Sequence, residues 1–392
     1  MEDVVIVAAA RTPIGTFGGA FKSVSAVELG TVAAKAVYEQ AGVSPEETDE
    51  VIIGSVLNAG LGQNVARQVA LGAGCPYTVP AMTLDKVCGS SLRAITLAAQ
   101  IIRAGDAEII LAGGTENMSR APYLQKSARW GARMGPSELS DYMVDDGLTD
   151  VFNDYHMGVT AENVAEQWQL SREEQDAFAA ESQKKAREAM ESGRFESEIV
   201  PVEVTDRKGR VTVIDRDEHP RPETTLESLR SLHPAFKKEG TVTAGNASGI
   251  NDGAAMVLVL SRSRAAAMGL SPIATITSFA SGGVDPSVMG VAPISAVQSA
   301  LEKAKFSKAD VDLWEINEAF ASQSIAVARE LAIPHKRLNV NGGAIALGHP
   351  IGASGARIVV TLLHEMVRRK SGFGVAALCI GGGQSDAVLF SR

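Results

Sequence analysis

Cysteine is scarce in this chain, with three residues in 392, and the odd number excludes a fully paired disulfide framework. The sequence also lacks a CxxC pair, and none of its six histidines forms an HxxxH pair. These absences argue against a zinc-type metal site and favour a reducing compartment. We therefore expect a cytoplasmic protein that holds no metal.

Long apolar runs and basic charge are lacking as well. No segment approaches the roughly 18 uninterrupted apolar residues that a membrane-spanning helix needs. The amino terminus opens with Glu2 and Asp3 and has no basic region of the kind that begins a secretory signal. The formal net charge of −9 argues against a nucleic-acid or membrane-surface partner. Residues 207–238, richer in Lys and Arg than in Asp and Glu, are the best candidate for a local anion patch, with a solvated surface as the alternative.

Aromatic residues make up only 5% of the chain, whereas 38 glycines indicate close packing of small side chains. A length of 392 residues favours two or three domains. The apolar runs of strand length are mostly continuous, as in strands buried on both faces, and helical patterns lie between them. We therefore predict a mostly parallel α/β sheet. The runs are Val4–Ala10, Val51–Ile53, Ile109–Ala112, Ala255–Leu260, Ile273–Phe279 and Val375–Ile380.

The chain also repeats part of itself. Residues 36–49 resemble residues 299–312, and at the same offset Gly89 faces Gly352, each opening a helix. Both of these helices are apolar nearly all round, which predicts that they lie back to back between two sheets. We therefore predict a layered α/β/α/β/α core, built from two similar α/β domains related by a pseudo-twofold axis.

A more polar segment interrupts the first half of the chain. We interpret residues 121–245 as an inserted loop domain, because they are richer in charge and turn residues than their surroundings. This division leaves residues 1–120 and 246–270 as the N-terminal domain and residues 271–392 as the C-terminal domain.

Cys88 is the first candidate for chemistry. It lies in the segment Asp85-Lys-Val-Cys88-Gly-Ser-Ser, between a short strand and a buried helix. A thiol at a helix N-terminus feels the positive end of the helix dipole, which lowers its pKa and favours the thiolate. A free cysteine is more often a small buried apolar side chain, so position alone leaves both interpretations open.

His349 strengthens the case for a nucleophile. It lies in the glycine-rich segment 339–357, and the repeat offset places it opposite Lys86, two residues from Cys88. If the halves are related by a twofold axis, Cys88 and His349 approach that axis together, and a cysteine beside a histidine is an activated nucleophile. The glycines leave backbone N–H groups free for an oxyanion. A histidine packed at a glycine-rich turn is the ordinary alternative.

Two more candidates follow apolar strands, at the strand ends where open α/β sheets bind ligands. Cys379 ends the run before Gly381-Gly-Gly383, and Asn317 lies in the segment Trp314–Phe320. A side-chain amide can position a water molecule or bind an oxyanion. A structural buried cysteine and a helix N-cap at Asn317 are the alternatives, and Cys75 receives no role.

Together these segments resemble the signature of the thiolase family. Four motifs occur in the family's order and near its spacing, and the similarity covers the whole chain. The motifs are Cys88-Gly-Ser, Asn317-Glu-Ala-Phe320, Gly348-His-Pro-Ile-Gly-Ala-Ser-Gly355 and Cys379-Ile-Gly-Gly-Gly383.

The resemblance implies a thiolase-like fold and an acyltransferase with ping-pong Claisen chemistry, here converting two acetyl-CoA into acetoacetyl-CoA and CoA. It requires no cofactor beyond the coenzyme A thioesters, which bind against the loop domain as substrates. By the same resemblance, Cys88 carries the acyl group, His349 activates this thiol and helps bind the thioester oxygen, and Cys379 moves the α-proton. Asn317 holds a water beside the enolate, and the N–H groups of Cys88 and Gly381 form the second oxyanion hole.

The resemblance also assigns the walls of the substrate pocket. Tyr155–Gly158 matches the loop that closes over the acyl pocket in short-chain members, which favours acetyl units. The matched positions are Arg221, Ser228, Ser248, His156, Ala244 and Phe236 for coenzyme A, and Met157, Met289, Ala319 and Phe320 for the pocket walls.

Two residues depart from the family's usual pattern. Asp85 stands where the family has Asn, and an ionised Asp85 would raise the pKa of the Cys88 thiol and slow acylation. Ser91 stands where the family has Gly, and we expect it to crowd the first turn of its helix. Both departures bear on the rate more than on the type of reaction.

Several alternatives remain beside an acetyl-specific enzyme. One is a ketoacyl or hydroxymethylglutaryl-type synthase, against which Cys379 argues. The others are a 3-ketoacyl-CoA thiolase of broader chain length and a non-catalytic acyl-CoA carrier. The resemblance implies a homotetramer or homodimer, with tetramer contacts expected near Trp130–Met134, and leaves the direction of the reaction open.

Overall fold

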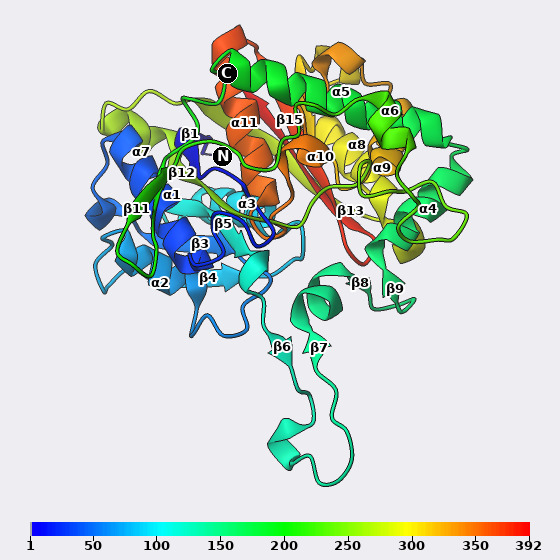
Figure 1. The fold of residues 1–392 in the computed structure, drawn as a ribbon. Helices are drawn as coiled ribbons and strands as arrows, with labels where there is room; N and C mark the ends of the chain where they lie inside the picture. The colour runs from blue at the N-terminus through cyan, green and yellow to red at the C-terminus, as the bar shows by residue number, and fades with distance from the viewer. Residues whose placement is uncertain (1) are drawn as a thin grey trace.

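A computed structural model describes residues 2–392, and one mixed sheet crosses it from side to side (Figure 1). Its strands follow the order β14-β15-β16-β13-β1-β12-β5-β3-β4. We call β1, β12, β5, β3 and β4 the N-terminal half-sheet, and β13, β16, β15 and β14 the C-terminal half-sheet. The strands are β1 Val4–Arg11, β3 Glu50–Gly54, β4 Ala81–Leu84, β5 Ile109–Asn117, β12 Asn251–Ser261, β13 Ala274–Gly283, β14 Leu313–Ile316, β15 Phe373–Ile380 and β16 Gln384–Ser391.

The two half-sheets share one topology. In the first, β3 is parallel to β5, and β5, β12 and β1 follow as antiparallel neighbours. In the second, β14 is parallel to β15, and β15, β16 and β13 follow as antiparallel neighbours. Antiparallel pairing of β1 with β13, through Val5↔Thr275 and Ile6↔Ala274, joins the halves at the centre. This arrangement confirms the predicted repeat of two α/β halves.

The prediction of a mostly parallel sheet is wrong. Only β3–β4, β3–β5 and β14–β15 are parallel among the pairs of the described sheet. The continuous apolar runs arise because helices cover both faces of the sheet, and this burial does not require parallel neighbours. The tight turn Gly381–Gly383, with positive φ at Gly382 and Gly383, returns the chain directly from β15 into antiparallel β16.

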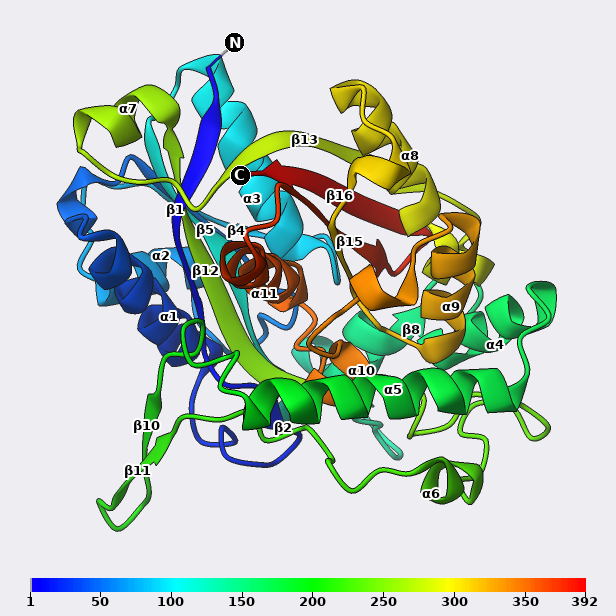
Figure 2. The same cartoon turned by 90° about the horizontal axis from the view of Figure 1, so that it is seen from above.

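Two apolar helices lie between the half-sheets, as Figure 2 shows from above. α3 (Ser90–Ala104) and α11 (Ser354–Arg369) share one core with the inward faces of both half-sheets. α1 (Ala26–Ala41) and α2 (Val65–Gly72) cover the outer face of the N-terminal half, whereas α8 (Pro293–Ala304) and α9 (Ala321–Glu330) cover that of the C-terminal half. The five predicted layers are therefore present.

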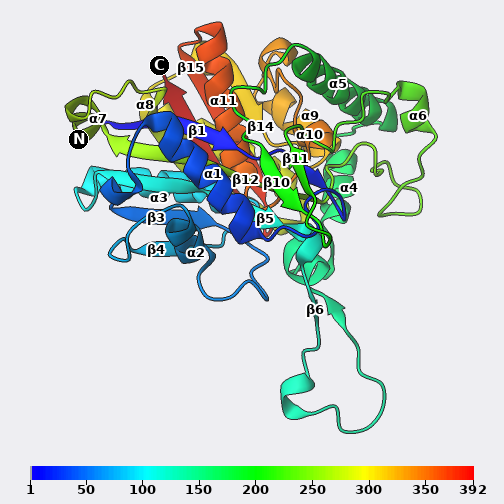
Figure 3. The ribbon, with the colours of Figure 1, turned by 60° about the vertical axis from the view of Figure 1, so that its left-hand side comes forward.

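Between β5 and β12 the chain leaves the sheet after Asn117 and returns at Asn251. This segment includes the excursion through β6 and β7, which extends away from the body in Figures 1 and 3. In residues 2–392, the structure has no helix both long and apolar enough to cross a membrane. The elements of the segment are β6 Tyr123–Leu124, β7 Ser140–Asp141, β8 Thr149–Asp150, β9 Tyr155–His156, α4 Met157–Gln167, α5 Arg172–Glu191, β10 Val202–Thr205, β11 Val211–Ile214 and α6 Leu226–Arg230.

Candidate active site

One cavity of about 500 Å³ collects most of the residues singled out from the sequence. Its walls come from both halves of the fold and from the segment between β5 and β12. This volume lies in the range of small-molecule sites, and much of the lining is apolar with a few polar groups, as such sites usually are. The predicted residues that line it are Cys88, His349, Cys379, Gly381, Arg221, Ser248, His156, Ala244, Phe236, Met157, Met289, Ala319 and Phe320.

Cys88 lies in the short connection between β4 and α3. The preceding residue, Val87, has φ of 47°, a left-handed conformation that is strained for a β-branched side chain. The Asp85 carboxylate accepts a hydrogen bond of 2.8 Å from the Val87 N–H and so stabilises this bend. A Cβ at Gly89 would lie 2.2 Å from the Ile380 side chain, so a larger residue would displace that side chain where the Cys88 turn meets β15.

The predicted low pKa of the Cys88 thiol is wrong for the free protein. Burial raises the pKa to about 11, because the thiolate loses its hydration. The backbone N–H groups of Gly381 and of Cys88 itself favour the thiolate and oppose this rise in pKa, whereas Glu116 and Asp85 add to it. The thiol is therefore protonated near neutral pH, and its attack needs a base.

His349 is available as that base. It is buried, and burial together with the positive charge of Arg357 lowers its pKa to about 4, so the ring is neutral near pH 7. Its backbone N–H donates to Asn251 Oδ1 at 2.9 Å, which fixes the loop. Its Nδ1 lies 2.6 Å from Ser354 Oγ, so Nε2 is the ring nitrogen left for the cavity.

Asn317 and Cys379 lie beside this histidine at the ends of neighbouring strands. The Asn317 backbone N–H donates to Ala377 O at 3.0 Å, and its side-chain nitrogen lies 3.4 Å from His349 Nδ1. α9 begins only at Ala321, so the alternative of an N-cap at Asn317 is wrong. Cys379 lines the same cavity as Cys88, and burial together with the charge of Cys88 raises the pKa of its thiol.

The segment after β5 forms the other side of the cavity. The His156 ring stacks on Phe236 with centroids 4.7 Å apart, and its Nδ1 accepts from the Gly158 N–H at 3.0 Å, capping α4. Arg221 lies exposed on the cavity wall, where a cation can meet an anionic ligand. Ser228 does not line the cavity: it is exposed in α6, and its hydroxyl donates to Thr225 O.

Sequence reasoning missed part of the lining. Most of these residues are small or apolar and carry no motif that marks them in one sequence. His219 differs from the others because its side chain can titrate. Burial and the charge of Arg221 lower the pKa of this histidine to about 4. The missed residues are Thr16, Phe17, Val87, Met118, Gly147, Leu148, His219, Ala235, Ala247, Gly249, Ile250 and Ile351.

Glu116 was also missed, although it lies at the end of a fully buried strand. Its carboxylate accepts backbone N–H bonds from Val56 and Leu57 at 3.1 Å and from Gly352 at 2.9 Å. It thus ties the loop after β3 to the loop that carries His349. Burial raises the Glu116 pKa to about 7. The sequence did contain a signal for Glu116, which is a carboxyl group directly after an apolar run. A buried acid needs hydrogen-bond donors, so such a residue is expected to bind backbone or side-chain N–H groups.

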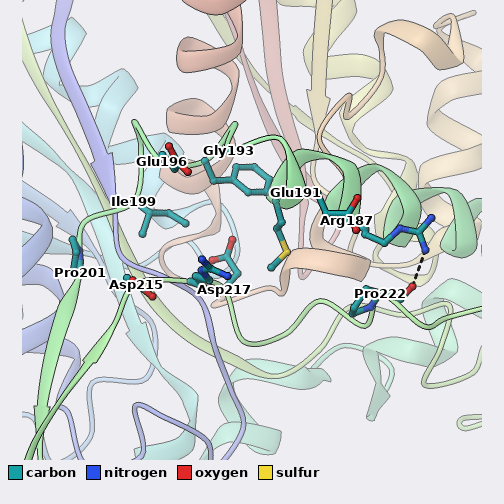
Figure 4. A pocket seen from close by; sticks show the side chains of 12 residues that line it. Arg187, Glu191, Gly193, Glu196, Ile199, Pro201, Asp215, Asp217 and Pro222 are labelled. Atoms are coloured by element: carbon teal, nitrogen blue, oxygen red, sulfur yellow. Dashed lines mark hydrogen bonds between the residues drawn. The ribbon is translucent and has the colours of Figure 1, made fainter.

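A second cavity, of about 440 Å³, lies beside the end of α5 (Figure 4). It contains none of the residues predicted to be reactive. Its fully buried carboxylate, Asp217, is paired with Arg11 at 2.7 Å, and Arg187 donates to Pro222 O. Its buried charge is satisfied within the protein, so the first cavity is the candidate active site.

Known proteins resemble this chain over its whole length. Two family models match it: "Thiolase, N-terminal domain" over residues 4–263 and "Thiolase, C-terminal domain" over residues 270–392. The acetyl-CoA acetyltransferase of Pseudomonas aeruginosa is 59% identical over 392 residues, with 100% of both chains covered. That of Syntrophomonas wolfei is 58% identical, with 99% of this chain and 98% of the relative covered.

A solved structure agrees with these relatives. The crystal structure of the Bacillus anthracis acetyl-CoA acetyltransferase matches with a TM-score of 0.98 at 46% identity, covering 100% of this chain and 99% of that chain. Family models, relatives and solved structure thus agree over both halves of the fold, and the chain belongs to the thiolase family.

Proposed function

We propose that this protein is an acetyl-CoA C-acetyltransferase, which interconverts two acetyl-CoA with acetoacetyl-CoA and CoA. The observation that carries the proposal is that two thiols, Cys88 and Cys379, line one cavity with a neutral buried histidine, His349. A carrier that only binds acyl-CoA has no use for two thiols and a base in one pocket. The names of the full-length relatives support the same activity.

In the first half-reaction, His349 Nε2 takes the proton of the Cys88 thiol while the sulfur attacks the thioester carbonyl of acetyl-CoA. The N–H groups of Cys88 and Gly381, which favour negative charge at the sulfur, can stabilise the oxyanion that forms beside it. The bond from the carbonyl carbon to the CoA sulfur then breaks, and the departing CoA thiolate takes the proton from Nε2. Acetyl-Cys88 and CoA result, as expected for ping-pong chemistry.

In the second half-reaction, the neutral His349 takes the proton of the Cys379 thiol, and the resulting thiolate takes a proton from the methyl carbon of a second acetyl-CoA. This carbon attacks acetyl-Cys88, the carbon–sulfur bond breaks, and the released Cys88 sulfur takes the proton held by His349, while Cys379 is again a thiol. Burial is the largest cause of the raised pKa of Cys379, and a thiolate at Cys88 would raise it further. Acetyl-Cys88 cannot ionise, so after the first half-reaction no such charge opposes the base. One polar atom of the Asn317 side-chain amide is buried without a protein partner in the described chain, which suits a bound water.

Short acyl chains are favoured by two methionines in the cavity wall. Met157 opens α4 and approaches Gly381, where an added Cβ would lie 3.0 Å from the methionine methyl group. Met289 is buried in the same apolar cluster as Cys379. These side chains fill space beside the reacting sulfur, and a longer acyl chain would have to displace them.

The decisive experiment is intact-protein mass spectrometry after brief incubation with acetyl-CoA, with Cys88→Ala as the control. One added acetyl group in the wild type, absent from the variant, is expected. No adduct from acetyl-CoA or acetoacetyl-CoA would overturn the proposal and favour a binding protein. Comparing adducts from acetyl-CoA and from longer 3-ketoacyl-CoA separates acetyl specificity from broader chain length.

We also propose a homo-oligomer in the cytoplasm. The excursion through β6 and β7 carries large exposed apolar side chains, Tyr123, Trp130, Met134 and Leu139, which are unusual on a monomer surface. Three unpaired cysteines, two of them with proposed chemical roles, suit a reducing compartment. Light scattering on Trp130→Asp/Met134→Asp tests the oligomer: a smaller assembly is expected, and an unchanged mass would contradict this role of the excursion.

A further inference from the structure

We propose that Ser354 is a positioning residue, whose hydroxyl holds His349 in the tautomer that leaves Nε2 free to take the Cys88 proton. The inference rests on the proposed function, because it concerns the base of the first half-reaction. Ser354 thereby joins the site as the residue that prepares His349 for that role.

The hydrogen bonds of the Ser354 side chain carry the inference. Ser354 is buried in the first turn of α11, and its Oγ donates to Pro350 O at 2.8 Å. A hydroxyl has one proton, so the same oxygen can only accept from a second partner. That partner is His349 Nδ1 at 2.6 Å, which must therefore carry the proton. In a neutral ring the other nitrogen, Nε2, is then a bare acceptor.

Asn317 fits the same tautomer once its amide is turned over. Its nitrogen lies 3.4 Å from His349 Nδ1, a long contact in which two N–H groups would face each other. Rotation of the amide by half a turn replaces this clash by Oδ1, a second and weaker acceptor that shares the Nδ1–H with Ser354 and that otherwise has no donor in the described chain. The Asn317 amide nitrogen is then free to donate to a water or an oxyanion.

The opposite tautomer needs a different arrangement. Ser354 would have to turn its proton from Pro350 O to Nδ1, leaving Pro350 O with the Ala353 N–H alone. Nε2 would then carry a proton and could not accept that of Cys88. The general-base step would fail while the cavity kept its shape.

The surrounding charges keep the ring neutral but do not choose the tautomer. Arg357, one turn further along α11, disfavours the imidazolium, and its own charge is paired with Glu315 at 3.0 Å. The thiols of Cys88 and Cys379 are the other titratable groups of this part of the cavity. The choice between the two nitrogens therefore falls to the contact at Nδ1.

The test compares Ser354→Ala with Ser354→Thr, which keeps the hydroxyl. Ser324→Ala is the matched control, because Ser324 is also buried near the start of a helix and donates to the carbonyl four residues earlier, at 3.0 Å. For Ser354→Ala we expect kcat about 10- to 100-fold lower with KM within about twofold, as for loss of an orienting partner of a histidine. Ser354→Thr should recover most of the rate, and Ser324→Ala should match the wild type.

Alkylation of Cys88 by iodoacetamide supplies a readout that does not use coenzyme A. At pH 7, Ser354→Ala should react about 10-fold or more slowly than the wild type, by the same loss of the base. The difference should vanish above about pH 11, where the thiol ionises without help. Equal rates at pH 7, or a deficit that persists at high pH, would overturn the inference. A wild type that alkylates normally but forms no acetyl adduct would instead reject the proposed function.

Discussion

The two halves of the fold share a topology but divide the chemistry. The N-terminal half supplies Cys88 at the start of α3, whereas the C-terminal half supplies Asn317, His349 and Cys379. Neither α3 nor α11 has a side-chain cap at its N-terminus, whereas the peripheral helices α1 and α5 both begin with capping boxes. The helices that meet at the site thus leave their first N–H groups to tertiary partners or to ligands.

This difference shows how a repeated fold acquires an asymmetric site. The twofold brings the two helix starts together, and specific side chains then cross between the halves. Lys86 pairs with Asp386 at 2.7 Å, Glu116 binds the Gly352 N–H at 2.9 Å, and Ser91 Oγ accepts from the Ala356 N–H at 2.9 Å. Four substitutions test whether each half contributes what the geometry assigns to it.

The largest effect is expected from Cys379→Ser, which separates the two half-reactions. Loss of this base should lower the condensation rate by about 10²- to 10⁴-fold, the usual worth of general acid–base catalysis. Acetylation of Cys88 should persist, because it depends on the other thiol and on His349. Steady-state rates and adduct mass spectrometry measure the two halves separately. Loss of the acetyl adduct as well would contradict the division of roles.

Glu116→Gln should weaken the connection between the halves in a pH-dependent way. The folded-state pKa of about 7 exceeds the ordinary value of 4.5, so the native state binds the proton more tightly than the unfolded chain. This contribution to stability is fully present below about pH 4.5 and is lost as pH rises through 7, a change of about 3 kcal/mol. Denaturant unfolding should show the wild-type advantage over the variant shrinking across this window. A constant difference would contradict the raised pKa.

Ser91→Gly should mainly affect stability. The hydroxyl that accepts from Ala356 would be lost, leaving a buried N–H without its partner at a cost of about 1–3 kcal/mol. We expected Ser91 to crowd the first turn of its helix, but the structure shows instead that its hydroxyl accepts a hydrogen bond from α11. Ser91→Ala removes the same acceptor but keeps a Cβ. Comparing the two variants therefore separates the loss of the hydrogen bond from the added backbone freedom of glycine. If both variants unfold at the wild-type midpoint, the bond between Ser91 and Ala356 does not contribute to the stability of the contact between the halves.

Asp85→Asn should have the smallest effect. The amide oxygen can still accept from Val87, so the bend before Cys88 is kept, while a charge that raises the pKa of the Cys88 thiol is removed. Iodoacetamide should then react about two- to fivefold faster near pH 8, with the gain reduced by salt. The gain should also disappear at low pH, where Asp85 is protonated. A slower reaction would mean that the carboxylate is needed for the bend.

Much of the fold could be predicted from local pattern. The apolar runs marked strands such as β1, whose observed bounds, Val4–Arg11, are within one residue of the run Val4–Ala10. The repeat indicated the two halves and the buried pair of helices. Strand direction could not be predicted in this way, because a strand covered on both faces has the same apolar pattern in parallel and antiparallel pairs. The placement of Ser228 outside the cavity also depended on how α6 packs.

The sequence by itself determined which side chains are reactive and which segments are buried, since residue type and apolar spacing are local properties. The tertiary structure decided their chemical state. The Cys88 thiol has a raised pKa because burial outweighs the helix N-terminus, and His349 is neutral because burial and Arg357 act together. The contacts of Glu116 and Ser91 with the opposite half join residues far apart in the chain, so they exist only once the two half-sheets close around α3 and α11.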